Sequence, residues 1–166
     1  NKDTSGTIVV AKDDKSHKNL IKQFKNRKTK KIYQAIVLGN LDYDDGKINA
    51  PIGRDPNNRT RMAVVKHNSK KAVTYFKVIN RNEKYTYLEL ELKTGRTHQI
   101  RVHLSYLGHP ILGDEKYGEN DINLKSLNRQ MLHAYKLGFY HPIRQKWMEF
   151  KAELPQDFKK VQKKIN

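Results

Sequence analysis

The chain has 166 residues, and its 36% of apolar residues can form the core of one domain. Its 34 Lys and Arg residues against 17 Asp and Glu residues give a formal net charge of +17, which scattered surface lysines explain poorly and which favours a nucleic acid as partner. The absence of cysteine excludes disulfides and thiolate metal sites and fits a cytoplasmic protein, while the apolar runs are too short to cross a membrane.

The first half of the chain alternates short apolar runs with basic, polar segments. It predicts, in order, a strand at Thr7–Lys12, a lysine-rich amphipathic helix with Leu20, Ile21 and Phe24 on its apolar face, a strand at Lys31–Leu38, a turn at Asp44–Gly46, a strand at Lys47–Pro51, a basic loop at Asp55–Arg61 and a strand at Met62–Val65. The strand at Lys31–Leu38 is apolar on both sides, so we expect it to be covered on both faces and Tyr33 to be held in a fixed direction.

The second half carries the clearest strand patterns. It predicts an antiparallel hairpin of Ala72–Ile79 and Tyr85–Leu92, a helix through Ile100, Leu104 and Leu107 that is capped by Thr97 and ends at Gly108, a strand pair at Met131–Tyr140 and Trp147–Leu154, and a terminal helix after Pro155 with Phe158, Val161 and Ile165 facing inward. The sum is an α+β fold, a mainly antiparallel mixed sheet with a few flanking helices, in a single domain over residues 1–166.

The segment Thr94–His103 (TGRTHQIRVH) concentrates side-chain donors where a strand passes into a helix. A metal site fits poorly, because His98 and His103 point to different sides of a helix and no adjacent carboxylate completes a ligand set. Arginine and histidine are also ordinary at exposed helix starts. A phosphate site fits best, because Arg96 and His98 lie at the start of a helix, where free backbone N–H groups attract anions. Arg101, at the edge of the buried stripe, is expected to pair with a carboxylate in a cleft.

Segments spread over nearly the whole chain resemble, in family order, the motifs of the RluA/RluD-type RNA pseudouridine synthases. These segments are KDTSGTIVVAK at 2–12, KIYQAIVLG at 31–39, APIGRDPNNRTRMAV at 50–64, KAVTYF at 71–76, TGRTHQIRVHLSYLGHPILGDEKYG at 94–118 and LHAYKLGFYHP at 132–142.

The resemblance implies an isomerase that converts uridine to pseudouridine in structured RNA, with ribosomal RNA as the expected substrate. The reaction detaches the base from C1′, turns it and rejoins it through C5, and it needs no cofactor. The base must leave its helix or loop, a carboxylate must act at the ribose, and another group must remove the C5 proton. A monomer that contacts RNA and no membrane is expected.

The resemblance also assigns roles to individual residues. Tyr33 would lie against the flipped uracil and help with the C5 proton, Arg101 would pair with the catalytic carboxylate, and Leu132 would line the uracil pocket. Five basic residues would follow the RNA backbone: Arg54, Arg59, Arg61, Arg96 and His98. The structural alternatives are a half-buried strand tyrosine, an ordinary ion-pair arginine, a core leucine and, for the first three arginines, a solvated loop.

One position departs from the family pattern. The catalytic aspartate of the family motif H-R-L-D-x-x-T-S-G falls on Asn1, whose amide has neither the charge nor the basicity of a carboxylate. We therefore expect the chain as written to bind RNA and to be inactive or nearly so. Asp3 is a poor substitute, because a shift of two residues along a strand moves a carboxylate by several ångströms.

Asn1 leaves several interpretations open. It could be an engineered trap, a natural pseudoenzyme, the result of a cut in a longer chain or an error in residue assignment. The expected arginine and leucine before the aspartate position are absent, as is the N-terminal RNA-binding domain of many relatives, so we expect the natural protein to be longer. A noncatalytic RNA-binding protein on the same fold is the main alternative function. A DNA-binding module fits the charge but lacks a recognisable recognition helix.

Overall fold

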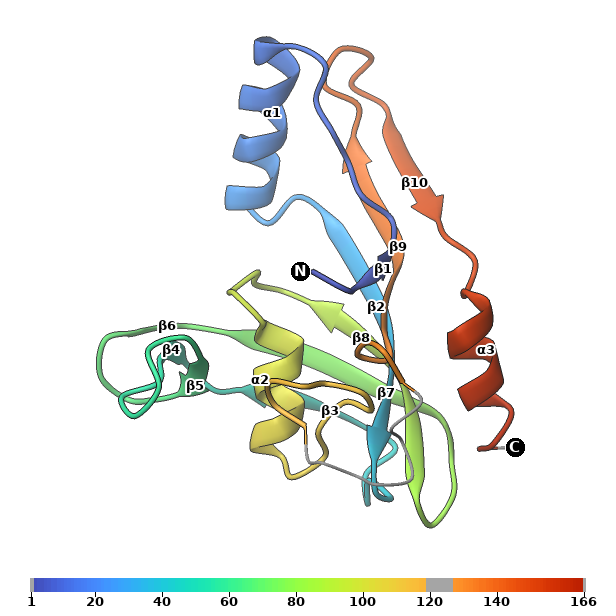
Figure 1. Ribbon diagram of the computed structural model, residues 1–166. Coiled ribbons are helices and arrows are strands. Elements are labelled where there is room, and N and C mark those ends of the chain that lie inside the picture. The colour runs from blue at the N-terminus through green and yellow to red at the C-terminus, as the bar shows by residue number, and fades with distance from the viewer. Residues whose placement is uncertain (1, 119–126, 166) are drawn as a thin grey trace.

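The computed structural model describes residues 2–118 and 127–165, and strands dominate it (Figure 1). The strands are β1 (Ser5–Gly6), β2 (Lys30–Leu38), β3 (Asp45–Asn49), β4 (Ile52–Arg54), β5 (Met62–Val64), β6 (Ser69–Lys70), β7 (Val73–Arg81), β8 (Tyr85–Leu92), β9 (Leu132–Tyr140) and β10 (Trp147–Lys151). The helices are α1 (Asp14–Lys25), α2 (Gln99–Tyr106) and α3 (Gln156–Gln162). Within these ranges no helix is long and apolar enough to span a membrane.

The main sheet has the strand order β1-β9-β2-β8-β7-β3, with β10 paired to β9, and only the β1–β9 pairing is parallel among its described strands. A small separate sheet has the order β5-β4-β6. The predicted α+β fold with a mainly antiparallel mixed sheet is therefore confirmed. The predicted hairpin of β7 and β8 and the predicted pair of β9 and β10 are both antiparallel.

Helices α2 and α3 cover opposite faces of the main sheet (Figure 1). On one face, the Thr74 hydroxyl of β7 lies 2.9 Å from Nδ1 of His103 on α2. On the other face, the Phe158 ring of α3 packs edge-on against the Tyr87 ring of β8, with 6.0 Å between the ring centroids. Phe158 is completely buried, as the sequence predicts for the inward side of the terminal helix.

The predicted strand at Thr7–Lys12 is wrong in position and length. Only Ser5 and Gly6 pair with β9, and the amide of Thr7 donates the next backbone hydrogen bond, 2.8 Å to the Ala134 carbonyl. Beyond this point Ile8 and Val10 are largely exposed. The β-branched composition indicates an extended backbone but not a neighbouring strand, because strand propensity depends on the partner available.

Two local details also differ from the sequence prediction. Residue 98 rather than Thr97 occupies the N-cap position of α2, and His98 has a left-handed backbone (φ 55°) and no side-chain capping bond. The expected turn at Asp44–Gly46 is shorter, because Asp45 and Gly46 already pair with β7 in β3. The shorter turn follows from the pairing of β3 with β7, a strand that lies about 30 residues further along the chain.

Candidate active site

The turn between β8 and α2 is held by one glutamine. The side chain of Gln99 accepts hydrogen bonds from the Thr94 hydroxyl (2.7 Å) and the Arg96 amide (3.0 Å), and it donates to the Val73 carbonyl and the Thr74 hydroxyl (both 3.0 Å). All four hydrogen-bonding positions of the amide group are thus used, and Gln99 is only 2% exposed. This network fixes the start of α2 against β7.

His103 belongs to the same structural support. Its Nδ1 lies 2.9 Å from the Thr74 hydroxyl and its Nε2 lies 2.9 Å from the Ala50 carbonyl, and the side chain is completely buried. Burial lowers the pKa of His103, which keeps the ring neutral at pH 7. Much of the donor-rich segment therefore has a structural role, because its side chains hold α2 in place. The placement of α2 in turn fixes the position of Arg101.

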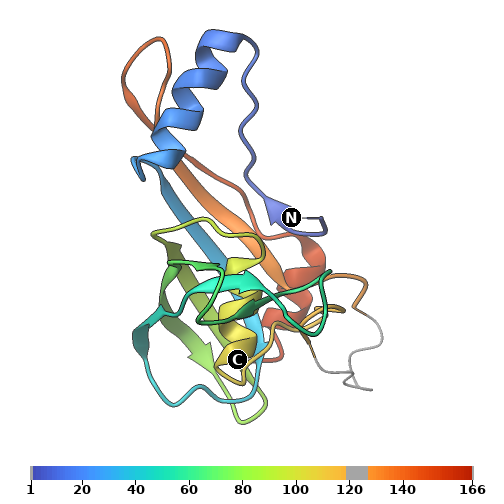
Figure 2. The same cartoon turned by 90° about the vertical axis from the view of Figure 1, so that its left-hand side faces the viewer.

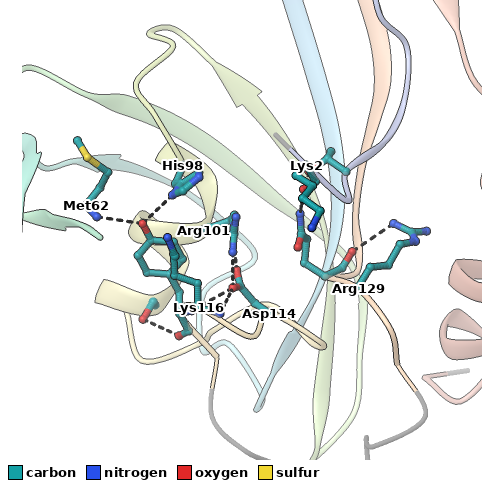
Figure 3. Close-up of polar contacts among 11 residues, drawn as sticks. Lys2, Met62, His98, Arg101, Asp114, Lys116 and Arg129 are labelled. Carbon is teal, nitrogen blue, oxygen red and sulfur yellow. Dashed lines mark hydrogen bonds and ion pairs between the residues drawn. The ribbon is translucent and has the colours of Figure 1, made fainter. Parts of the chain in front are cut away.

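Arg101 forms a buried, two-pronged ion pair with Asp114 (Figure 3). Its Nε and Nη2 each lie 2.7 Å from a carboxylate oxygen of Asp114, and the backbone amides of Lys116 and Tyr117 donate to the same carboxylate at 3.0 Å. Burial alone would raise the pKa of Asp114, but these hydrogen bonds and the charge of Arg101 outweigh it and leave the pKa below its usual 3.8. The expectation that Arg101 pairs with a carboxylate is met by Asp114 in the described part of the chain, and its pairing with a catalytic carboxylate at position 1 stays a prediction.

Tyr117 connects this ion pair to the neighbouring loop. The guanidinium of Arg101 lies 5.0 Å from the centre of the Tyr117 ring, and that of Arg61 lies 5.9 Å from it. The Tyr117 hydroxyl is 2.8 Å from Nδ1 of His98 and accepts a bond of 3.0 Å from the Met62 amide (Figure 3). Burial, followed by the charge of Arg101, lowers the pKa of His98, so the imidazole is predominantly neutral at pH 7.

Tyr33 and Leu132 lie on the face of the main sheet that α2 covers. Directly paired residues point to the same side of a sheet, and Tyr33 pairs with Leu90, which pairs with Phe76, two residues from Thr74. By the same alternation Leu132, which pairs with Ala35, points to the α2 side and is 1% exposed. Burial raises the pKa of Tyr33, so its phenol stays protonated at pH 7.

The β2–β9 pairing is irregular at Tyr33. Ile32 pairs with Lys136 and Gln34 with His133, so Tyr33 faces two residues of β9. Such bulges redirect side chains and are common beside active sites. The extra residue lies in β9, whereas Tyr33 keeps its regular pairing with Leu90 of β8.

The first described residues are held in place by β9 and by Gln130, which lies just before β9. Gln130 donates through Nε2 to the Lys2 carbonyl (2.8 Å) and to the Thr4 hydroxyl (3.1 Å) (Figure 3). The Ser5 hydroxyl lies 2.9 Å from Nδ1 of His133. The segment TSG is therefore positioned by β9 and the residues before it. Asn1, the predicted position of the catalytic aspartate, lies outside the described residues.

The predicted RNA-contacting arginines fall into two groups. Arg54 and Arg59 are exposed on the small sheet and its loop, where Nη1 of Arg54 donates to the Arg59 carbonyl at 3.1 Å. Arg61 is half-buried beside Tyr117. Arg96 is half-buried, and its Nε donates to the Lys71 carbonyl at 2.9 Å.

Sequence reasoning gave no role to four residues that organise the site: Gln99, Asp114, Tyr117 and Gln130. Asp114 and Tyr117 lie in segment 94–118. A buried arginine needs a carboxylate partner, and this requirement of Arg101 was the signal that could have identified Asp114. Gln130 had no local signal, because its partners are more than a hundred residues away. Within the described ranges no three His, Cys, Asp or Glu side chains gather as a metal site would require.

Residues 1–106 match the family model described as RNA pseudouridylate synthase, and the chain belongs to this family. It is 47% identical over 156 residues to a Bacillus subtilis protein named "Uncharacterized RNA pseudouridine synthase YlyB", covering 94% of this chain and 50% of the relative. It is 46% identical over 165 residues to a Neisseria meningitidis protein named "Ribosomal large subunit pseudouridine synthase D", covering 94% of this chain and 44% of the relative. The predicted RluA/RluD-type relationship is confirmed.

A solved structure titled "Human RNA Pseudouridylate Synthase Domain Containing 1" has the same fold, with a TM-score of 0.83 and 30% identity over 93% of this chain and 66% of the human chain. Another, titled "Human RNA Pseudouridylate Synthase Domain Containing 4", has a TM-score of 0.75 and 25% identity over 92% of this chain and 68% of the other. The chain spans about half the length of the curated relatives it matches.

Proposed function

We propose that this chain is the catalytic domain of an RNA pseudouridine synthase that acts on structured RNA. The observation that carries the proposal is the ion pair between Arg101 and Asp114. It holds Arg101 of α2 in place over the face of the sheet on which Tyr33 and Leu132 lie. The family membership of the chain supports the reaction class.

In the proposed mechanism Arg101 orients the catalytic carboxylate. Asp114 occupies Nε and Nη2 of the guanidinium, and Nη1 is the remaining nitrogen that would donate to a carboxylate at position 1. That carboxylate would attack C1′ of the target uridine or take a proton from C2′. Leu132 would contact the flipped base, and Tyr33 would lie against it. The Tyr33 phenol, which burial keeps protonated, would relay the C5 proton by accepting it at the phenol oxygen while its own proton passes to water.

Ribosomal RNA is the proposed substrate, because the Neisseria relative carries the ribosomal large subunit in its name. The net charge of +17 supports a polyanionic partner, and Arg54, Arg59, Arg61, Arg96 and His98 would contact its phosphates. We propose a cytoplasmic monomer that works without a cofactor. The decisive test is tritium release from ribosomal RNA labelled at C5 of uracil, by the protein with aspartate at position 1.

A noncatalytic RNA-binding protein is the second candidate, and Asn1 is the observation that favours it. An asparagine keeps the shape of aspartate but cannot act as a base or nucleophile in this reaction. In this case the chain would bind or remodel RNA. RNA binding that depends on salt, without tritium release by either the Asn or the Asp form, would support this candidate.

Replacing Tyr33 with phenylalanine in the protein with aspartate at position 1 is expected to lower tritium release by about 10²-fold or more, because the phenol no longer assists proton transfer. RNA affinity should change less than about twofold, since the ring and its stacking area remain. The matched control is Tyr75→Phe, on β7 and exposed, which should keep full activity. Undiminished release by Tyr33→Phe would remove Tyr33 from the mechanism.

A further inference from the structure

A groove lies between α1 and the loop that joins β8 to α2, and it shares Thr94 and Arg96 of that loop with the candidate active site. It has a volume of about 580 Å³, and its apolar floor includes Leu20, Ile21 and Phe24. In both ribbon views α1, the extended segment before it and the β9–β10 turn project together at one end of the domain, above that loop (Figures 1 and 2). We call this feature the α1 groove.

The apolar face of α1 is only partly used by the core. Leu20 is buried, but Ile21 is 51% and Phe24 is 37% exposed, so the predicted apolar face exists and is only partly covered. The helix positions that line the groove, 17, 20, 21, 24 and 25, share one side of α1. The Phe24 ring and the Ile21 side chain are therefore accessible to a ligand on the surface of this highly charged chain.

The rim of the α1 groove is positively charged. Lys25, Arg27 and Lys31 line it and form no ion pair with any described residue, whereas Lys93 is paired with Glu91 at 3.4 Å. No carboxylate is present among the described side chains that line the groove. A groove with an apolar floor and unneutralised cations on its rim complements a flexible polyanion that has apolar faces of its own.

Lys31 links the groove to the candidate active site. Its ammonium lies beside Gly95 in the β8–α2 turn, and Lys31 is two residues before Tyr33 on β2, so both side chains point to the α2 side of the sheet. Burial, followed by repulsion from Arg27, lowers the pKa of Lys31. A bound phosphate would relieve that repulsion, and a strand lying in the groove would lead toward Tyr33.

We propose that the α1 groove binds a single-stranded RNA segment that flanks the target uridine. Bases would stack on Phe24 and contact Ile21, while Lys25, Arg27 and Lys31 would bind the phosphates. Single-stranded rather than duplex RNA is inferred because bases reach an aromatic floor only when they are unpaired. The inference rests on the proposed function, which supplies RNA as the substrate class.

The test compares two double variants that remove the same charge from the same helix region. Lys25→Gln with Arg27→Gln changes the groove, and Lys15→Gln with Lys18→Gln changes exposed lysines of α1 that do not line it. Fluorescence anisotropy measures their affinity for a labelled uridine oligomer of about 12 nucleotides, within the site sizes of single-strand-binding grooves, at several salt concentrations. The groove pair should raise Kd about tenfold and reduce the salt slope by about 1.4, and the control pair should have a clearly smaller effect.

Phe24 is tested in the same assay. Phe24→Ala should raise Kd for the single strand about tenfold and leave the affinity for duplex RNA nearly unchanged. Phe24→Leu, which keeps an apolar side chain but no ring, should show an intermediate loss. Tyr43→Ala, which removes an exposed aromatic residue that does not line the groove, is the control. Circular dichroism confirms that each variant is folded.

Three outcomes would overturn the proposal. Equal losses in the two double variants would mean that the surface charge acts without a site. An effect of Phe24→Ala on self-association or on binding of an acidic peptide, with RNA binding intact, would assign the groove to a protein partner. Failure of the unchanged chain to bind RNA would refute both the groove and the proposed function, whereas loss of tritium release alone would leave the groove assignment standing.

Discussion

Aspartate in place of Asn1, in a protein that also carries the upstream residues of the family motif, is expected to raise tritium release from uracil-labelled ribosomal RNA by about 10³-fold or more. The change supplies a carboxylate that can act as a base or nucleophile, and such groups contribute about 10² to 10⁴-fold. The asparagine form should show release close to background. RNA affinity should be similar in both forms, because aspartate and asparagine have nearly the same shape.

Asp3 provides the control for this experiment. Its backbone carbonyl accepts a hydrogen bond of 3.4 Å from Nη1 of Arg129, so its backbone is held by the residue next to Gln130. Asp3→Asn in the protein with aspartate at position 1 should keep full activity. If instead the asparagine form at position 1 is active and Asp3→Asn abolishes that activity, Asp3 is the catalytic carboxylate. If neither form at position 1 releases tritium, the noncatalytic RNA-binding function is preferred.

Local patterns predicted the elements whose structure is decided locally. The alternation of Leu88, Leu90 and Leu92 with glutamates placed β8 correctly, because one face of this strand is buried and the period of two is visible in the sequence. The extended run after Gly6 misled the prediction, because Ile8 and Val10 have strand composition but pair with no strand in the described part of the chain. A sequence pattern describes the chain's own preference and not the partner that the fold supplies.

The site could be predicted in kind but not in its pairings. The sequence indicated that Arg101 needs a carboxylate partner, but it contains several acidic residues near Asp114 and does not show which of them is the partner. The fold decides this, because the turn after α2 brings Asp114 back to Arg101. Likewise the amphipathic pattern of α1 predicted an apolar face through Phe24 but not that part of this face would open onto a groove. Both results depend on how elements meet in space, which periodicity does not encode.

Replacing Asp114 with asparagine is expected to reduce the free energy of unfolding at pH 7 by about 3 to 5 kcal/mol, the cost of leaving one member of a buried ion pair without its partner. Asparagine can offer only one oxygen to the two nitrogens of Arg101, and its amide group would direct donors at the guanidinium. Guanidinium chloride unfolding measures the change. The control is Asp157→Asn, which breaks the more exposed pair with Arg129 and should cost about 1 kcal/mol or less.

The pH dependence of the free energy of unfolding distinguishes a buried ion pair at Asp114 from a side chain that only fills space there. The folded-state pKa of Asp114 lies below the usual value of 3.8, so its contribution to stability is complete above the unfolded-state pKa and is lost as the pH falls through the folded-state pKa. The unchanged protein should therefore lose this stability below about pH 4, and Asp114→Asn should lack that part of the loss. Parallel pH curves for the two proteins would show that Asp114 acts through shape alone. If the folded Asp114→Asn protein with aspartate at position 1 still binds RNA but no longer releases tritium, Asp114 acts in the reaction by positioning Arg101.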